Sequence, residues 1–109
     1  MTDREARVAK NEAVAREINE GIEEAMAAVS HEGYARMLCE CGQADCERVI
    51  AISVAEYEEA RRDARRFVIV KEHLIPDVER IVDETGRFVV VQKREGTPAE
   101  VAEATDPRD

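Results

Sequence analysis

The chain has 109 residues, the length of one domain, and its hydrophobic fraction of 44% owes much to alanine. Tryptophan is absent and only two tyrosines and two phenylalanines are present, so few large side chains are available for a core. A structural metal adds most to such a domain. The 16 basic and 25 acidic residues give a formal net charge of −9, which disfavours nonspecific binding to nucleic-acid phosphates.

The N-terminal segment and the hydropathy pattern predict a cytoplasmic protein with no membrane segment. The first seven residues contain no apolar signal region, and no stretch approaches the ~18 consecutive apolar residues of a membrane span. Three cysteines are an odd number, and neighbours spaced Cys-x-Cys pair poorly in a disulfide. In a reducing compartment, clustered thiols more often bind a metal.

Residues 3–29 are predicted to form one long amphipathic helix. Apolar side chains recur in it at spacings of three and four, at Val14, Ile18, Ile22, Ala25, Met26 and Val29. At ~1.5 Å per residue such a helix is ~40 Å long, more than a small domain needs for its own core. The stripe is therefore expected to pack partly across the same chain and partly against a second copy or another protein.

The next segment predicts a hairpin and a short helix. Residues 34–38 and 47–52 are apolar enough for two strands, and the cysteine cluster between them would form the tip. Ser53 and Glu56 form a capping box, so a helix begins there and runs to about residue 63, with Tyr57 and Ala60 on its inner face. The basic run 61–66 is interpreted as a solvated helix end.

The C-terminal half predicts more strands and a final helix. Residues 67–70 suit a buried strand, and Pro76 ends regular pairing after it. Residues 78–83 and 87–93 are interpreted as a hairpin, although 78–82 also suits a short helix. Pro98 favours a helix start at residue 97. The expected fold is α+β: a long N-terminal helix (1–30), a metal-stapled α+β domain with a small antiparallel sheet and a zinc-ribbon-like knuckle (31–96), and a C-terminal helix and tail (97–109).

The cysteine cluster is the strongest chemical signal in the chain. Cys39, Cys41 and Cys46 lie within eight residues, and Zn²⁺ takes four tetrahedral ligands from thiolates and imidazoles. The chain has two histidines. His73, near the end of a strand, is preferred as the fourth ligand over His31, which lies in a glycine-containing loop; water or an acidic side chain is a further alternative. Iron–sulfur binding is disfavoured because its usual thiolate spacings differ.

The sequence contains few residues arranged as in known catalytic motifs. It has no glycine-rich phosphate loop, no His-Glu-x-x-His run and no nucleophile elbow. The sequence therefore favours a non-catalytic zinc-binding protein that contacts another protein or a second copy of itself, with regulation as one role it could serve. A thiol-based redox or metal sensor is the first alternative, because zinc thiolates can be oxidised with loss of the metal. A nucleic-acid-binding zinc ribbon that uses residues 61–66 is the second.

A set of motifs spans almost the whole chain. It comprises Arg7-x3-Asn11-Glu12, Glu17-Ile18-Asn19-Glu20, Leu38-Cys39-Glu40-Cys41-x4-Cys46, Glu56-Tyr57-Glu58 with Arg61, Phe67-Val68, His73, Val78-Glu79-Arg80, and Val89-Val90-Val91-x-Lys93. In these motifs the chain resembles a group of small actinobacterial proteins without an assigned function. The resemblance implies one compact fold and a bacterial cytosolic setting, and it implies no catalytic activity.

Overall fold

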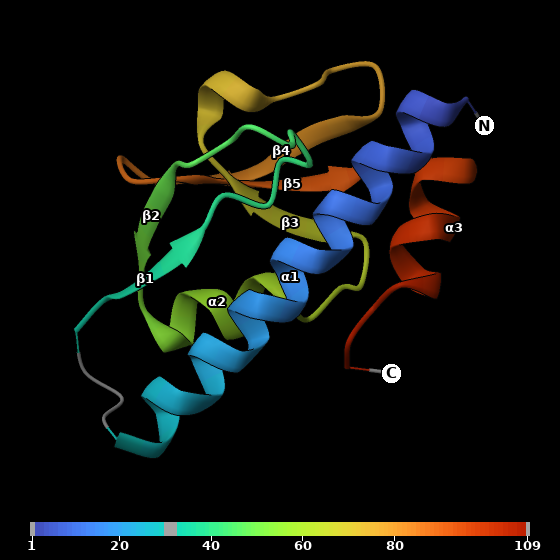
Figure 1. Ribbon diagram of the computed structural model, residues 1–109. Helices are drawn as coiled ribbons and strands as arrows, with labels where there is room; N and C mark the ends of the chain where they lie inside the picture. The colour runs from blue at the N-terminus through green and yellow to red at the C-terminus, as the bar shows by residue number, and fades with distance from the viewer. Residues whose placement is uncertain (1, 30–32, 109) are drawn as a thin grey trace.

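The computed structural model describes residues 2–29 and 33–108, and its elements follow the order expected from the sequence (Figure 1). The helices are α1 (Asp3–Val29), α2 (Val54–Ala60) and α3 (Thr97–Ala104), with a short 3-10 helix, η1 (Lys71–His73). The strands are β1 (Ala35–Leu38), β2 (Val49–Ile52), β3 (Arg66–Ile69), β4 (Glu79–Glu84) and β5 (Val89–Lys93). The α+β class, the long first helix and the knuckle between β1 and β2 are confirmed.

The strands form two small antiparallel sheets. β1 and β2 pair alone, with Ala35 opposite Ile52 and Leu38 opposite Val49. The second sheet has the order β3-β5-β4, so the hairpin of β4 and β5 is joined by β3 on the free side of β5. α1 crosses in front of both sheets and contacts β1, α2 and α3 (Figure 1). This long helix therefore links the two sheets to the C-terminal helix.

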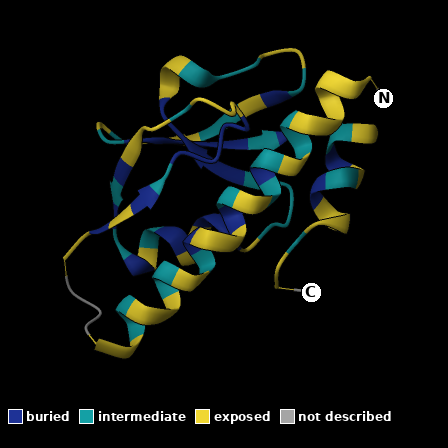
Figure 2. Ribbon diagram, in the orientation of Figure 1, coloured by how far each residue is buried: buried dark blue, intermediate teal, exposed yellow. Residues whose placement is uncertain are grey.

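The apolar core is formed by the inner faces of both sheets together with residues of α2 and α3, and Ile22 and Met26 of α1 pack against it. β3 and β5 are the most deeply buried strands, as their dark colour in Figure 2 shows, because their apolar runs face covered surfaces on both sides. The predicted capping box forms: Ser53 Oγ accepts from Glu56 N–H, and the Glu56 side chain accepts from Ser53 N–H. It starts α2 so that Tyr57 and Ala60 are buried, as expected.

The buried face of α1 differs from the expected apolar stripe. Its fully buried residues are polar: Glu12, Arg16 and Asn19. Val14 and Ile18 keep 46% of their surface exposed. Ile22 and Met26, in the second half of the helix, do pack partly against the core. The helix is oriented by polar side chains that bond to other segments, a contribution that hydrophobic periodicity does not register.

The basic run at residues 61–66 is also less solvated than expected. Arg61 is only 4% exposed and forms an ion pair with Asp106 near the C-terminus. Arg65 is held by Asp63, and Arg66 donates to Gln92 on β5. The interpretation of the run as a solvated helix end is therefore wrong for Arg61, because acidic groups far away in sequence compensate its burial. No helix within 2–29 and 33–108 combines the length and the apolar character needed to cross a membrane.

Candidate metal centre

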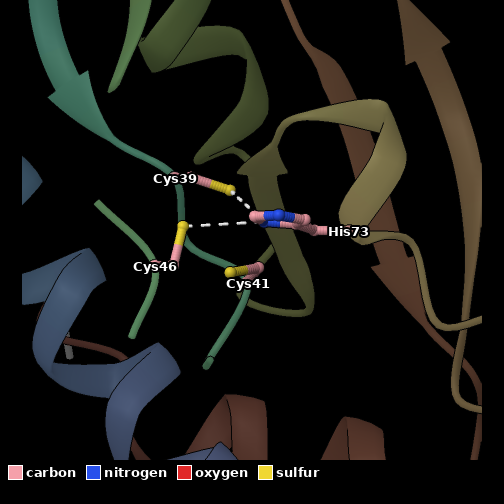
Figure 3. A group of neighbouring side chains, drawn as sticks. All are labelled: Cys39, Cys41, Cys46 and His73. Carbon is pink, nitrogen blue, oxygen red and sulfur yellow. Dashed lines mark hydrogen bonds between the residues drawn. The ribbon is translucent and has the colours of Figure 1, made fainter. Parts of the chain in front are cut away.

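Three cysteines and one histidine converge beside the second sheet. The ligand atoms of Cys39, Cys41, Cys46 and His73 all lie within 4.8 Å of one another. Nδ1 of His73 is 3.7 Å from Cys39 Sγ and 3.5 Å from Cys46 Sγ. Figure 3 shows the three sulfurs gathered on one side of the imidazole ring. The structure thus brings together the four residues that the sequence singles out and places them where they could bind a metal ion.

The spacing of these atoms fits a tetrahedral site. With Zn–S of about 2.3 Å and Zn–N of about 2.0 to 2.1 Å, a sulfur and a nitrogen ligand of one ion are about 3.5 to 3.6 Å apart. The two measured Sγ to Nδ1 distances, 3.5 and 3.7 Å, match this edge length. None of the cysteines forms a disulfide. The donor set and its dimensions therefore suit a thiophilic metal.

The knuckle is folded by backbone bonds and by one glycine. Cys39 N–H donates to Arg48 O, which continues the β1–β2 ladder, and Cys46 N–H donates to Gln43 O. Gly42 has φ +80°, and a Cβ on it would lie 2.7 Å from Val8 O. Asn11 Nδ2 also donates to Gly42 O. A glycine is thus needed both for the turn and for its close approach to α1.

The histidine is positioned by the end of β3. Val70 follows this strand, and η1 begins directly after it, where His73 N–H donates to Val70 O. The Val70 N–H donates to Cys39 Sγ over 3.2 Å, so one residue connects the histidine turn to the knuckle. Hydrogen bonds of this kind orient metal ligands and stabilise thiolates. The expectation that His73 lies near the end of a strand is confirmed.

The three thiols lie close enough to shift the pKa values of one another. The hydrogen bond with Cys39 lowers the pKa of Cys41 to about 5, whereas the same contact and burial raise the pKa of Cys39. Burial raises the pKa of Cys46 as well. Backbone hydrogen bonds from Gln43 and Arg48 oppose burial at Cys41 and Cys46. Cys41 is therefore the most acidic of the three thiols, and a metal bound by all three would displace the protons of the other two.

A buried polar network supports the knuckle from behind. Glu40, between two of the cysteines, is 0% exposed, and its carboxylate accepts from Val68 N–H, Asn19 Nδ2 and Tyr57 Oη, each at 2.9 Å. Asn19 also bonds to both backbone groups of Leu38. Burial raises the pKa of Glu40, and its three donors oppose that rise. The network joins α1, α2 and β3 to the residue between Cys39 and Cys41.

The sequence reading missed this network. The sequence predicts no role for Glu40 beyond its place in the Cys-Glu-Cys motif. The one sequence signal was that Glu40 stands between two cysteines in a segment expected to be folded tightly. The alternative ligand His31 lies outside the described residues.

Comparisons of the chain with protein-family models, with curated proteins and with solved structures find no match. The function is therefore inferred from the residues of the centre and of the surface around it.

Proposed function

We propose that this protein binds one Zn²⁺ through Cys39, Cys41, Cys46 and His73. The single observation that carries the proposal is the convergence of three sulfurs and one imidazole nitrogen at tetrahedral spacing. Zinc is favoured over iron because imidazole and thiolate together are a common structural zinc set, while iron–sulfur clusters use other thiolate spacings.

The proposed role of the metal is structural. Four protein ligands complete the tetrahedron and leave no position for an activated water, so the site would be closed rather than catalytic. The ligands come from the knuckle and from η1, so one ion would tie the two-stranded sheet to the end of β3. Cys39 and Cys41 are buried, and only Cys46 and His73 are partly exposed. Because the site would be closed to water, we expect the protein to act by binding rather than by catalysis.

The proposed working surface is the outer face of α1. Val14, Ile18 and Val29 are exposed at 46%, 46% and 86%. Gly21 and Ala25, also exposed, lie between them at helical spacing, so one apolar or small-residue stripe runs along the side opposite Glu12 and Arg16. Exposed apolar stripes of this kind favour contact with a partner helix. We expect the partner to be a second copy or another protein that packs along this stripe.

The metal proposal is tested by comparing His73→Ala with His31→Ala. Purified protein is dialysed against a competing chelator, and zinc per chain is measured by elemental analysis. We expect one zinc in the wild type and in His31→Ala. His73→Ala should bind zinc at least about 100-fold more weakly, since even residues behind the ligands alter affinity 10- to 100-fold. Equal retention in both variants, or a larger loss in His31→Ala, would contradict the assignment.

The contact proposal is tested with Val14→Lys/Ile18→Lys. Both side chains are half exposed, so lysine should leave folding and zinc content unchanged while weakening any association through the stripe. Sedimentation over a wide concentration range measures the effect, with Glu17→Lys, also on an exposed position, as the matched control. If the wild type remains monomeric at high concentration, self-association through the stripe is ruled out. If the double variant unfolds, the stripe belongs to the core and the proposal that it is a contact surface is wrong.

A thiol-based sensor is a second candidate, favoured by the mutual proximity of the sulfurs and by the partial exposure of Cys46. In this reaction hydrogen peroxide takes two electrons from two thiolates, one S–S bond forms, and two hydroxide ions and the Zn²⁺ are released. Peroxide should then release zinc, and a dithiol should restore binding. Retention of zinc under conditions that oxidise a free thiol would remove this candidate.

A further inference from the structure

A second candidate site lies at the N-terminal part of α1, where Val8 and Glu12 approach Gly42 of the knuckle on one side and line a cavity. A cavity of about 410 Å³ opens between the first turns of α1, the helix α3 and the end of β5. These three elements gather at one end of the molecule in Figure 1. Most of the wall is apolar and includes Val8, Ala9, Phe67, Val78, Pro98 and Val101. The volume is at the lower end of the range for small-molecule sites.

The floor of this cavity carries buried charges. Lys93, 4% exposed, donates from Nζ to Glu12 and to Glu79 at 2.5 and 2.7 Å. Glu79 is 3% exposed, and its other oxygen accepts from Ile75 N–H. Glu12 is 6% exposed and lines the cavity. Two carboxylates therefore face one ammonium, and Glu12 and Lys93 of this group line the cavity. When both carboxylates are ionised, the group carries an excess of one negative charge.

The unused acceptor is on Glu12. Oε2 of Glu12 takes the bond from Lys93, and among the residues that the structure describes no hydrogen bond reaches Oε1. Oε1 is not fully buried, so water or a ligand in the cavity can reach it and donate to it. Burial raises the pKa of Glu12 to about 7, in spite of the opposing charge of Lys93. Lys93 compensates one oxygen of this carboxylate, and the other oxygen remains available to a donor in the cavity.

We infer that the cavity binds a small organic ammonium, that is, an apolar body carrying one protonated amine. The amine would donate to Glu12 and neutralise the excess charge, while the body would fill the apolar wall formed by α1, α3 and Phe67. An anion is disfavoured, because Lys93 already donates to two carboxylates that would repel it. At the mouth, the exposed Arg4 and Glu5 offset one another. This inference does not depend on the metal centre.

The test compares three probes of matched size on the full chain: 2-phenylethylammonium, 2-phenylethanol and 3-phenylpropanoate. Binding is followed at pH 7.5 by amide chemical shifts in ¹H–¹⁵N NMR spectra. We expect the ammonium to bind about tenfold or more tightly than the alcohol, as a charge-assisted bond to a buried carboxylate implies, and the carboxylate to bind most weakly. The shifted amides should cluster on α1, α3 and the end of β5.

Two variants separate the charge from the cavity. Glu12→Gln should lose the preference for the ammonium over the alcohol, whereas Glu17→Gln on the exposed side of α1 should keep it. Ala9→Leu should fill the cavity and weaken all three probes while preserving the helix. If Glu12→Gln fails to fold, the inference is tested by the order of affinities of the three probes for the wild type and by the weaker binding expected for Ala9→Leu. Tighter binding of the carboxylate, equal binding of ammonium and alcohol, or no binding of any probe would overturn the inference.

Discussion

The two sheets of this protein are held together by different means. The β3-β5-β4 sheet has apolar runs at its centre, with Phe67, Val68, Val89 and Val91 nearly inaccessible to solvent. The β1–β2 pair has four residues in each strand, of which Ala35, Met37, Ile50 and Ile52 are buried in the same core, whereas Arg36 and Val49 are exposed. The knuckle, Glu40 and Asn19 add polar connections to the rest of the molecule. The β3-β5-β4 sheet is stabilised mainly by burial, and the β1–β2 pair depends more on polar contacts and on the proposed metal site.

This difference follows from strand length and composition. A two-stranded ribbon buries too little apolar surface to be stable by itself. It therefore needs constraints that do not scale with area, such as bonds to one metal ion or a fully satisfied buried carboxylate. The three-stranded sheet has one more strand and longer buried apolar runs, so it depends less on such constraints.

The largest effect is expected from removing the metal that the cysteine cluster is proposed to hold. Chelation should lower the free energy of unfolding by at least about 3 kcal/mol, a fall in Tm of at least about 10 °C for a chain of this size. In hydrogen exchange, amide protection should be lost first at Met37 and Ile50, and later at Val68 and Val90. An unchanged melting curve in metal-free protein, or equal loss in both sheets, would contradict the comparison.

The next largest effect is expected from Glu40→Ala. The substitution leaves three buried donors, on Asn19, Tyr57 and Val68, without their acceptor, so we expect a loss of about 3 to 4 kcal/mol in denaturant unfolding. Glu40→Gln keeps the shape and one acceptor oxygen and should lose less. Glu47→Ala, at an exposed position of the same knuckle, should be within about 0.5 kcal/mol of wild type. Equal losses of unfolding free energy in Glu40→Ala and Glu47→Ala would show that the Glu40 network does not stabilise the knuckle.

A pair of glycines separates backbone strain from crowding. Gly42 and Gly33 both have φ +80°, but only at Gly42 would a Cβ meet other atoms, at 2.7 Å from Val8 and Glu12. Gly33→Ala should therefore lose about 1 kcal/mol from the left-handed conformation alone. Gly42→Ala should lose about 2 to 4 kcal/mol, because Val8 O is backbone and cannot move aside cheaply. Thermal unfolding measures both, and equal losses would show that the knuckle does not pack tightly on α1.

The smallest effect is expected from Lys71→Ala. Lys71 on η1 pairs with Glu84 on β4, but the two side chains are 62% and 46% exposed. Surface pairs of this kind contribute about 0 to 1 kcal/mol. The variant should keep its zinc, and its free energy of unfolding should lie within about 0.5 kcal/mol of the wild-type value. The reason is that the proposed bond from His73 to the metal, rather than this ion pair, holds the histidine turn in place. A clear loss of zinc in Lys71→Ala would shift that role to the ion pair.

Local chemistry was enough for much of this structure to be predicted from the sequence. The limits of α1, the capping box at Ser53 and the start of α3 at Thr97 agree with the structure, because caps and helical periodicity act within a few residues. The cysteine cluster was visible for the same reason, and His73 was recognised because few histidines competed for the role. The strands were also found, with ends that differ by one or two residues.

Only the tertiary structure decided which polar groups are buried. Glu12, Arg16, Asn19 and Glu40 have the composition of a solvated surface, yet each is buried by segments between about 20 and 90 residues away along the chain. A sequence pattern registers hydrophobicity and local caps, but a buried charge is tolerated only when a distant partner is placed within hydrogen-bond distance. That placement is a property of the folded chain, and it is why the inner face of α1, the support of the knuckle and the charged floor of the cavity emerged only in three dimensions.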